Sequence, residues 1–546
     1  MHALATLNKL TMLKHLLPAA CYLLFLTANG QTPELILAAE DDVVQGIQEL
    51  GFSAGKLFFK AGDAIEPFGS PWVTDGTPGG TELVVHIPGG GGYDFTEANG
   101  ITFFSGADAN GDQELWKTDG TAAGTNLVAD IHPTDRGCKQ ILTEFDGRIY
   151  FVGNDGTSGD ELWASDGTLA GTIRIKDIHP GSGNGLDFPE HRVFNGRLYF
   201  TATDAENNKE LWATDGTEAG TVLVKDIHTA GSSTPSSYCV VGGRLYFSAG
   251  TVAEGRELWK SDGSSAGTVL VTDLEPGAGS TAIAEILEYD GNAYFLRGFS
   301  EPKELWVSDG TGAGTVLVED SVEGTAVYNG DLYFGKAVGY TAPFHRYALY
   351  RTDGTPGGGE LVKVIEGGNS QRYPRDLTVA HGKLYFLCLY DGVVGGANYI
   401  TNDLWVTDGT AENTRLITTD AGTPAIVYTA SGIVKAFGDL FFVAADDRGL
   451  YKLADPGSGV TAIAGHTAVS VYPNPATDLV RVSFGGTASF GRARITDSKG
   501  QQVADHRFTN VAGEQTLSIG NYPAGMYFMH LSNSRGEQGV ARFVKE

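Results

Sequence analysis

The chain has 546 residues, with 38 basic and 66 acidic side chains and a formal net charge of −28. Such an acidic surface repels anionic lipids and the phosphates of nucleic acids. We therefore do not expect nucleic acid as a partner. With 76 glycines, 41% hydrophobic and 10% aromatic residues, the composition is typical of a folded protein with many short strands joined by glycine turns.

The N-terminus has the pattern of a signal peptide. Residues 13–27 form a short apolar run behind Lys14, and small residues precede a cleavage point after Gly30. We therefore expect a signal peptide over residues 1–30. The apolar run is too short and too interrupted for a membrane span, so no transmembrane segment is expected after signal removal. A lipoprotein anchored at Cys21 is the alternative.

One sequence unit recurs nine times along most of the chain. Each unit contains an aromatic strand such as Leu198-Tyr199-Phe200, a loop, a Glu-Leu-Trp strand, an Asp-Gly-Thr turn and a final apolar strand. In the seventh and ninth units, Tyr350 and Tyr451 replace the tryptophan. The repeated tryptophans are Trp72, Trp116, Trp163, Trp212, Trp259, Trp306 and Trp405. We expect them to pack between neighbouring units.

The repeat predicts an all-β fold. Asn-Gly or Asp-Gly between two apolar runs is a hairpin signal, because the tight turn needs residues that accept a positive φ. Four short strands per unit describe a propeller blade. We expect a single β-propeller of eight or nine four-stranded blades, with an open solenoid as the alternative. Residues 35–39 and 460–463 are candidates to pair across the closure.

An aspartate lies three residues after the aromatic position in eight units. Its carboxylate can accept backbone N–H bonds within the turn, while the following glycine takes the unusual dihedral angle. We expect this turn to be structural. The aspartates are Asp75, Asp119, Asp166, Asp215, Asp262, Asp309, Asp353 and Asp408.

The run Glu-Leu-Trp-x-x-Asp-Gly-Thr-x-x-Gly-Thr resembles the ELWxxDGT repeat family of bacterial secreted and surface proteins. The resemblance covers roughly residues 50–455, and units one, seven and nine depart from the motif. It implies a propeller over residues 31–464 and no defined activity.

After the repeats, the sequence changes to alternating strands separated by Pro-Asn-Pro, Lys-Gly and Pro-Ala-Gly turns. These predict a small Ig-like β-sandwich over residues 470–546, after a linker at 465–469. The motif residues are Tyr472, Pro473, Asn474, Pro475, Gly525 and Tyr527. They resemble the C-terminal sorting domain of the type IX secretion system of Bacteroidota. The resemblance implies the secretion machinery as partner, passage through the outer membrane, removal of this domain and a secreted or cell-surface location.

Two groups of side chains are candidates for metal binding. His132, His179 and His228 occupy the same position in three successive units, where imidazoles could bind a transition metal. A turn preference is the alternative. The oxygens of Asp108, Asn110 and Asp112 are weak calcium candidates, with a polar loop as the alternative. We expect no other cofactor.

Cys138, Cys239 and Cys388 remain after signal removal and lie at least 100 residues apart. They form no zinc spacing and no disulfide framework. We expect small buried thiols, with one disulfide as the alternative.

No catalytic motif is present, and the regular scaffold with variable loops favours a non-enzymatic binding or adhesion protein with a glycan or protein ligand. A structural envelope component is the alternative. An extracellular hydrolase or lyase is a further one, because propellers also host enzymes.

Overall fold

The computed structural model describes residues 33–37, 45–187, 189–298, 303–341, 344–365, 374–394, 397–418, 426–427, 433–443, 449–454, 469–472, 478–484, 489–497, 502–512, 514–523, 525–532 and 538–545. The expected signal peptide, the expected linker up to residue 468, and Pro473, Asn474 and Pro475 of the tail motif lie outside these ranges.

The first five units each form a four-stranded antiparallel sheet in chain order. Unit one is β2 (Gln45–Ser53), β3 (Lys56–Gly62), β4 (Ser70–Thr74) and β5 (Thr81–Leu83), with the 3-10 helix η1 (Pro78–Gly80) before β5. Unit two is β6 (Gly91–Ala98), β7 (Ile101–Ala107), β8 (Gln113–Thr118) and β9 (Asn126–Ala129). Unit three is β10 (Cys138–Phe145), β11 (Arg148–Asn154), β12 (Asp160–Ser165) and β13 (Ile173–Lys176). Unit four is β14 (His191–Phe194), β15 (Arg197–Thr203), β16 (Lys209–Thr214) and β17 (Val222–Lys225). Unit five is β18 (Ser236–Val241), β19 (Arg244–Thr251), β20 (Gly255–Ser261) and β21 (Val269–Thr272).

Units six and seven share one seven-stranded sheet, because the long strand β25 serves both. Its strands are β22 (Ile283–Tyr289), β23 (Asn292–Arg297), β24 (Lys303–Ser308), β25 (Thr315–Tyr328), β26 (Asp331–Thr341), β27 (Phe344–Thr352) and β28 (Glu360–Ile365). Unit eight is β29 (Pro374–Ala380), β30 (Lys383–Val394), β31 (Ala397–Thr407) and β32 (Arg415–Leu416), with β33 (Ile426–Val427) also paired to β31. Unit nine is β34 (Ile433–Ala436), β35 (Asp439–Val443), β36 (Leu450–Leu453) and β1 (Glu34–Leu37).

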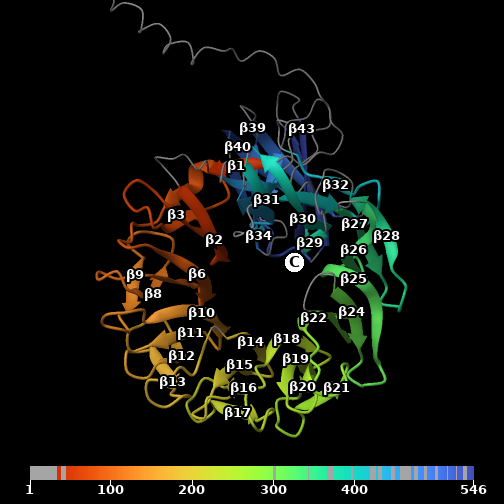
Figure 1. The fold of residues 1–546 in the computed structure, drawn as a ribbon. Helices are drawn as coiled ribbons and strands as arrows, with labels where there is room; N and C mark the ends of the chain where they lie inside the picture. The colour runs from red at the N-terminus through yellow and green to blue at the C-terminus, as the bar shows by residue number, and fades with distance from the viewer. Residues whose placement is uncertain are drawn as a thin grey trace, which may run out of the picture.

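The units stand around a central space (Figure 1). The first strand of each unit, such as β2, β6, β10, β14, β18 and β22, lies nearest the centre, and β9, β13, β17, β21 and β28 lie at the outside. The all-β fold class is confirmed, and strands β1–β36 form nine repeat units in eight sheets, because units six and seven share β25. Every sheet is itself open, so contacts between sheets hold the ring together.

The hairpin turns form where the sequence predicts them. Asn195 and Gly196 connect β14 to β15 with φ values of 47° and 68°, as a two-residue turn with positive φ at both positions requires. Because this turn fixes the pairing of Phe194 with Arg197, it sets the register of the whole hairpin.

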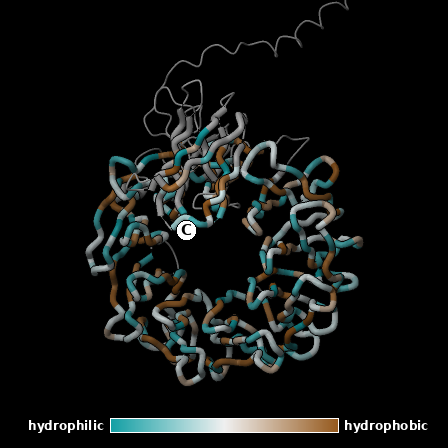
Figure 2. The backbone as a smooth tube through the Cα atoms, turned by 180° about the vertical axis from the view of Figure 1, so that it is seen from behind, coloured by the Kyte–Doolittle hydropathy of each residue, from teal (hydrophilic) through white to brown (hydrophobic). Residues whose placement is uncertain are grey.

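The apolar core lies between neighbouring units. In one cluster, Trp212 and Phe200 of unit four pack with Tyr150 and Leu162 of unit three. Trp212 is 8% exposed, and the other three side chains are fully buried. Hydrophobic and hydrophilic segments alternate all around the ring (Figure 2). The repeated tryptophan position therefore contributes to the contact between units.

The last unit packs against the first as consecutive units do elsewhere. β1 pairs with β36, so the N-terminal strand completes the ninth sheet. Ile36 of β1 shares a buried cluster with Leu57 of unit one and Phe441 of unit nine. Among the described residues, Leu35 of β1 pairs with Tyr451. Residues 460–463, the expected closure partner of residues 35–39, lie outside the described residues.

The C-terminal part forms two antiparallel sheets. The first contains β37 (Val469–Tyr472), β38 (Leu479–Phe484) and β41 (Glu514–Ser518). The second contains β39 (Ser489–Asp497), β40 (Gln502–Ala512), β42 (Gly525–Ser532) and β43 (Gln538–Lys545). Val480 and Val482 of the first sheet and Ile495 and Met529 of the second are all fully buried, as a small β-sandwich requires.

Candidate functional site

The Asp-Gly-Thr turn is a closed hydrogen-bond network. Asp215 Oδ1 accepts from the backbone N–H of Thr217 at 3.0 Å and from its hydroxyl at 2.7 Å. The Thr217 hydroxyl in turn accepts from the N–H of Gly220 at 2.9 Å. These donors hold the pKa of the Asp215 carboxyl below its usual value. The carboxylate is thus engaged within its own turn.

The glycine of this turn meets the preceding unit. Gly263 has a φ of 94°, and a Cβ built on it would lie 2.4 Å from Tyr199 Oη of unit four. Gly310 and Gly409 face the hydroxyls of Tyr246 and Tyr333 in the same way. The Leu-Tyr-Phe strand of one unit and the Asp-Gly-Thr turn of the next therefore fit each other.

A lysine after the aromatic position makes a second contact between units. Lys117 and Lys260 donate to the carbonyls of Gly167 and Gly310 in the following unit, both at 2.8 Å. Lys452 of unit nine donates to Gly76 O of unit one at 2.9 Å. The first and ninth units thus repeat the contact found between consecutive units.

The glutamate of Glu-Leu-Trp has a role that the sequence analysis missed. Glu161 is fully buried and accepts from the backbone N–H groups of Ile178, His179 and Gly185 at 2.8, 3.0 and 3.1 Å. These residues belong to the loop that leads from β13 to the next unit. Burial raises the pKa of the Glu161 carboxyl to about 7, although the N–H donors lower it in part.

The same buried contact recurs at Glu114, Glu210 and Glu257. The sequence signal is a glutamate directly before the Leu-Trp pair in four successive units. It can be recognised only once the loop 17 residues later is known to return to it.

Glu161→Gln is expected to flatten the pH dependence of stability. The native carboxyl keeps its proton between pH 4.5 and about 7 while the unfolded one has lost it, so unfolding free energy falls as pH rises through this window. The shift corresponds to up to about 3 kcal/mol, at 1.36 kcal/mol per unit. Urea unfolding at pH 5 and pH 8 measures the slope.

Glu304→Gln is the matched control. Glu304 occupies the same repeat position in unit six, but its side chain is 41% exposed and accepts from Arg297 and Trp306. Glu304→Gln should leave the slope of unfolding free energy against pH unchanged. An unaltered slope in the Glu161→Gln protein would contradict the raised pKa of the buried Glu161 carboxyl.

Three of the predicted metal ligands hydrogen-bond within the protein, Asp108 and His132 in their own loops and His179 to a residue of unit four. Asp108 Oδ1 accepts from the N–H groups of Asn110 and Asp112 at 2.8 and 3.0 Å, which shapes their loop. His179 Nε2 lies 3.2 Å from Asn207 Oδ1, and His132 Nδ1 accepts from the N–H of Thr134. Within the described ranges, no group of three or more His, Cys, Asp or Glu side chains is placed to hold a metal ion. Calcium binding stays a prediction.

The three cysteines are free and buried, which confirms the expected buried thiols. Burial raises the pKa of the Cys138 thiol well above its usual value.

In the C-terminal sheets, the tail-motif residue Tyr527 is 4% exposed, and its hydroxyl donates to Pro523 O at 2.7 Å.

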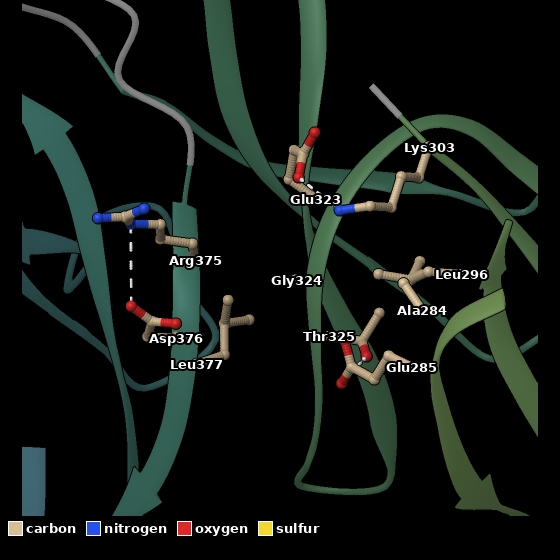
Figure 3. A pocket seen from close by; sticks show the side chains of 10 residues that line it. All are labelled: Ala284, Glu285, Leu296, Lys303, Glu323, Gly324, Thr325, Arg375, Asp376 and Leu377. Atoms are coloured by element: carbon tan, nitrogen blue, oxygen red, sulfur yellow. Dashed lines mark hydrogen bonds and ion pairs between the residues drawn. The ribbon is translucent and has the colours of Figure 1, made fainter. Parts of the chain in front are cut away.

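A polar cavity of about 480 Å³ lies between units six, seven and eight. Figure 3 shows its walls, which come from β22, β23, β24, β25 and β29. Its charged side chains are Glu285, Lys303, Glu323, Arg375 and Asp376. Because β22 and β29 are innermost strands, the cavity lies on the inner side of the ring.

The backbone that lines this cavity carries bulges with positive φ, as the innermost strands β2, β6 and β18 also do. β25 and β29 each carry a bulge, with Gly324 at φ 53° and Asp376 at φ 50°. A non-glycine residue in this region is held there at a cost of about 1 kcal/mol or more. The bulge at Asp376 redirects its carboxylate relative to a regular strand.

The two units beside the cavity have longer central hairpins. β26 and β27 have 11 and 9 residues, and β30 and β31 have 12 and 11, compared with 7 and 6 for β11 and β12 of unit three. The cavity residues Leu296 and Lys303 flank the corresponding hairpin loop of unit six. The cavity therefore lies at the end of the sheets from which these hairpins extend.

The cavity residues were not among the predicted site residues. They lie mainly on the innermost strands, whose charged residues are not repeated between units. The greater spacing between Tyr350 and Trp405 than between other successive aromatic positions is the sequence signal that marks this region.

No curated protein matches the chain. Among solved structures, a puromycin hydrolase is 14% identical, with a TM-score of 0.34 over 70% of this chain and 58% of that chain. A structure from a study of two prolyl endopeptidases is 12% identical, with a TM-score of 0.36 over 68% and 55%. Saccharomyces cerevisiae Sqt1 is 13% identical, with a TM-score of 0.35 over 72% and 99%. The chain thus spans little more than half the length of the first two, and at this identity no activity transfers.

Among the described residues, no helix has the length and apolar character that crossing a membrane requires.

One family model matches the C-terminal tail of the chain. Residues 470–546 match the model of the secretion system C-terminal sorting domain. The chain therefore carries a type IX sorting tail, which indicates export to the cell surface or beyond.

Proposed function

We propose that the exported protein is a non-enzymatic binding module, and that the cavity between units six, seven and eight holds its ligand. The repeated side chains are occupied in building the ring: the Asp-Gly-Thr carboxylates in their turns, and the buried glutamates in the loops between units. The cavity is the place where side chains that are not repeated gather.

The observation that carries this proposal is the cavity itself. Its volume of about 480 Å³ falls within the range of small-ligand sites. Five charged side chains line it, and the longer hairpins of two units stand beside it. Binding residues commonly lie on such departures from a regular scaffold.

The test compares two variants of the mature exported chain. Ala284 is exposed at the cavity wall, so Ala284→Trp should fill the cavity without disturbing the core. Ala123→Trp places the same indole on an exposed turn of unit two. The probes are panels of soluble oligosaccharides and short peptides on the immobilised protein.

We expect at least one probe to bind the wild-type and Ala123→Trp proteins with equal affinity, and the Ala284→Trp protein at least about tenfold more weakly. A panel in which no probe binds, or in which binding ignores Ala284→Trp, would favour a structural envelope role instead.

A further inference from the structure

We propose that this cavity recognises a primary ammonium group carried on an apolar stem, as in a lysyl side chain or a linear polyamine. The inference rests on the proposed binding function and names the chemistry of the ligand. Three carboxylates and two cations line the cavity, so its own charge is negative. The net charge of −28 also favours the approach of a cation over an anion.

The two cations are directed to carboxylates or amides of the protein. Lys303 Nζ lies 3.7 Å from Glu323 Oε2, and the Glu323 side chain is only 4% exposed. Arg375 donates to Asn402 Oδ1 at 2.6 Å and lies 3.8 Å from Asp376. In Figure 3 the Arg375 side chain extends away from Lys303 and Glu323. The charge of Lys303 is therefore offset by Glu323, and the charge of Arg375 by Asp376, within the wall of the cavity.

Glu285 is the carboxylate that remains. It is partly buried and accepts a hydrogen bond from the Thr325 hydroxyl at 2.9 Å, and among the described residues no ion pair is found for it. Burial and the nearby Asp376 raise the pKa of its carboxyl, while Lys303 lowers it. A carboxylate in this setting gains stabilisation from an incoming cation that can donate hydrogen bonds.

The rest of the wall suits a stem of methylene groups. Ala284, Leu296 and Leu377 supply apolar surface next to Glu285 and Thr325 (Figure 3). Among the described residues that line the cavity none is aromatic, so neither a stacked sugar ring nor an aromatic cage for a quaternary ammonium has a platform here. A small hydrogen-bonding ammonium is the cation that fits this lining.

The experiment uses the mature exported chain and two probe pairs that differ only by acetylation. They are a lysine-containing peptide and its Nε-acetyl form, and a linear polyamine and its acetylated form. Titration calorimetry gives each affinity. Which free amine binds tighter identifies the source of the group as peptide or polyamine.

We expect acetylation to weaken binding about 10- to 100-fold, the effect of losing a charge-assisted hydrogen bond. Glu285→Gln should weaken the free amines similarly. Glu190→Gln should not, because Glu190 is an exposed carboxylate next to the innermost strand β14, outside this cavity, and accepts from the N–H of Ser237. Affinity for the amine should rise with pH as Glu285 ionises.

Acetylated and free probes that bind equally well, but are blocked by Ala284→Trp, would overturn the ammonium inference and leave the binding function in place. If no probe from any panel binds in the cavity, both proposals fail.

Discussion

Ile36→Asp is expected to lower the unfolding free energy of the propeller by about 4 kcal/mol, since it removes a buried side chain and places a charge in an apolar cluster. Ile36 is 3% exposed and lies in the cluster shared by units nine and one. Urea unfolding gives the loss of stability, and hydrogen exchange gives its location. We expect exchange to increase first in β1, β35 and β36 and in the facing strands of unit one.

Leu35→Asp is the matched control in the same strand. Leu35 is 42% exposed, so the same carboxylate there remains in solvent. Its cost should stay below about 1 kcal/mol, as for most surface changes. Equal costs for the two variants would show that β1 is not packed between the last and first units.

Gly263→Ala is expected to cost about 3 kcal/mol, of which about 1 kcal/mol comes from the positive φ and the rest from overpacking. The new Cβ would meet Tyr199 Oη of the preceding unit at 2.4 Å. The added methyl group would thus disrupt the contact between the Asp-Gly-Ser turn of unit five and the Leu-Tyr-Phe strand of unit four. Thermal and urea unfolding of the mature chain measure the effect.

Gly111→Ala separates backbone strain from the contact. Gly111 has the same φ of 94° as Gly263, but nothing lies within 4 Å of a Cβ at this position. It should cost only about 1 kcal/mol. Tyr199→Phe should recover part of the Gly263→Ala loss by removing the clashing hydroxyl. A cost that is equal at both glycines, with no recovery, would contradict the proposed fit between motifs.

The sequence was sufficient to predict the parts of the fold that depend on neighbouring residues. A two-residue turn needs positive φ at two adjacent positions, so Asn195-Gly196 identifies its own hairpin. The alternation of each hairpin then places the aromatic residues on the faces between units. The all-β class follows from these local rules, applied nine times.

Features that depend on residues far apart in the chain were harder to predict. Residues 35–39 and 460–463 are both apolar, and composition alone does not say which strand edge β1 joins, so the pairing of Leu35 with Tyr451 was not predicted. No role of Glu161 was predicted, because its loop partners come many residues later in the chain.

The candidate site was not predicted at all. The residues chosen for metal binding, including Asp108 and His179, were recognised from their spacing along the chain, within one loop or at equivalent positions of successive units. The cavity instead combines Glu285, Thr325 and Asp376 from three units. Only the radial arrangement of the units brings these side chains together, and no periodicity within one unit reports that arrangement.

The central claim is that nine repeat units close into one ring, with the N-terminal strand completing the ninth. Electron cryomicroscopy of the purified mature protein tests it directly. We expect a closed ring of nine units in which the ninth contacts the first. An open arc, a stacked ladder or a ring of eight units would contradict it.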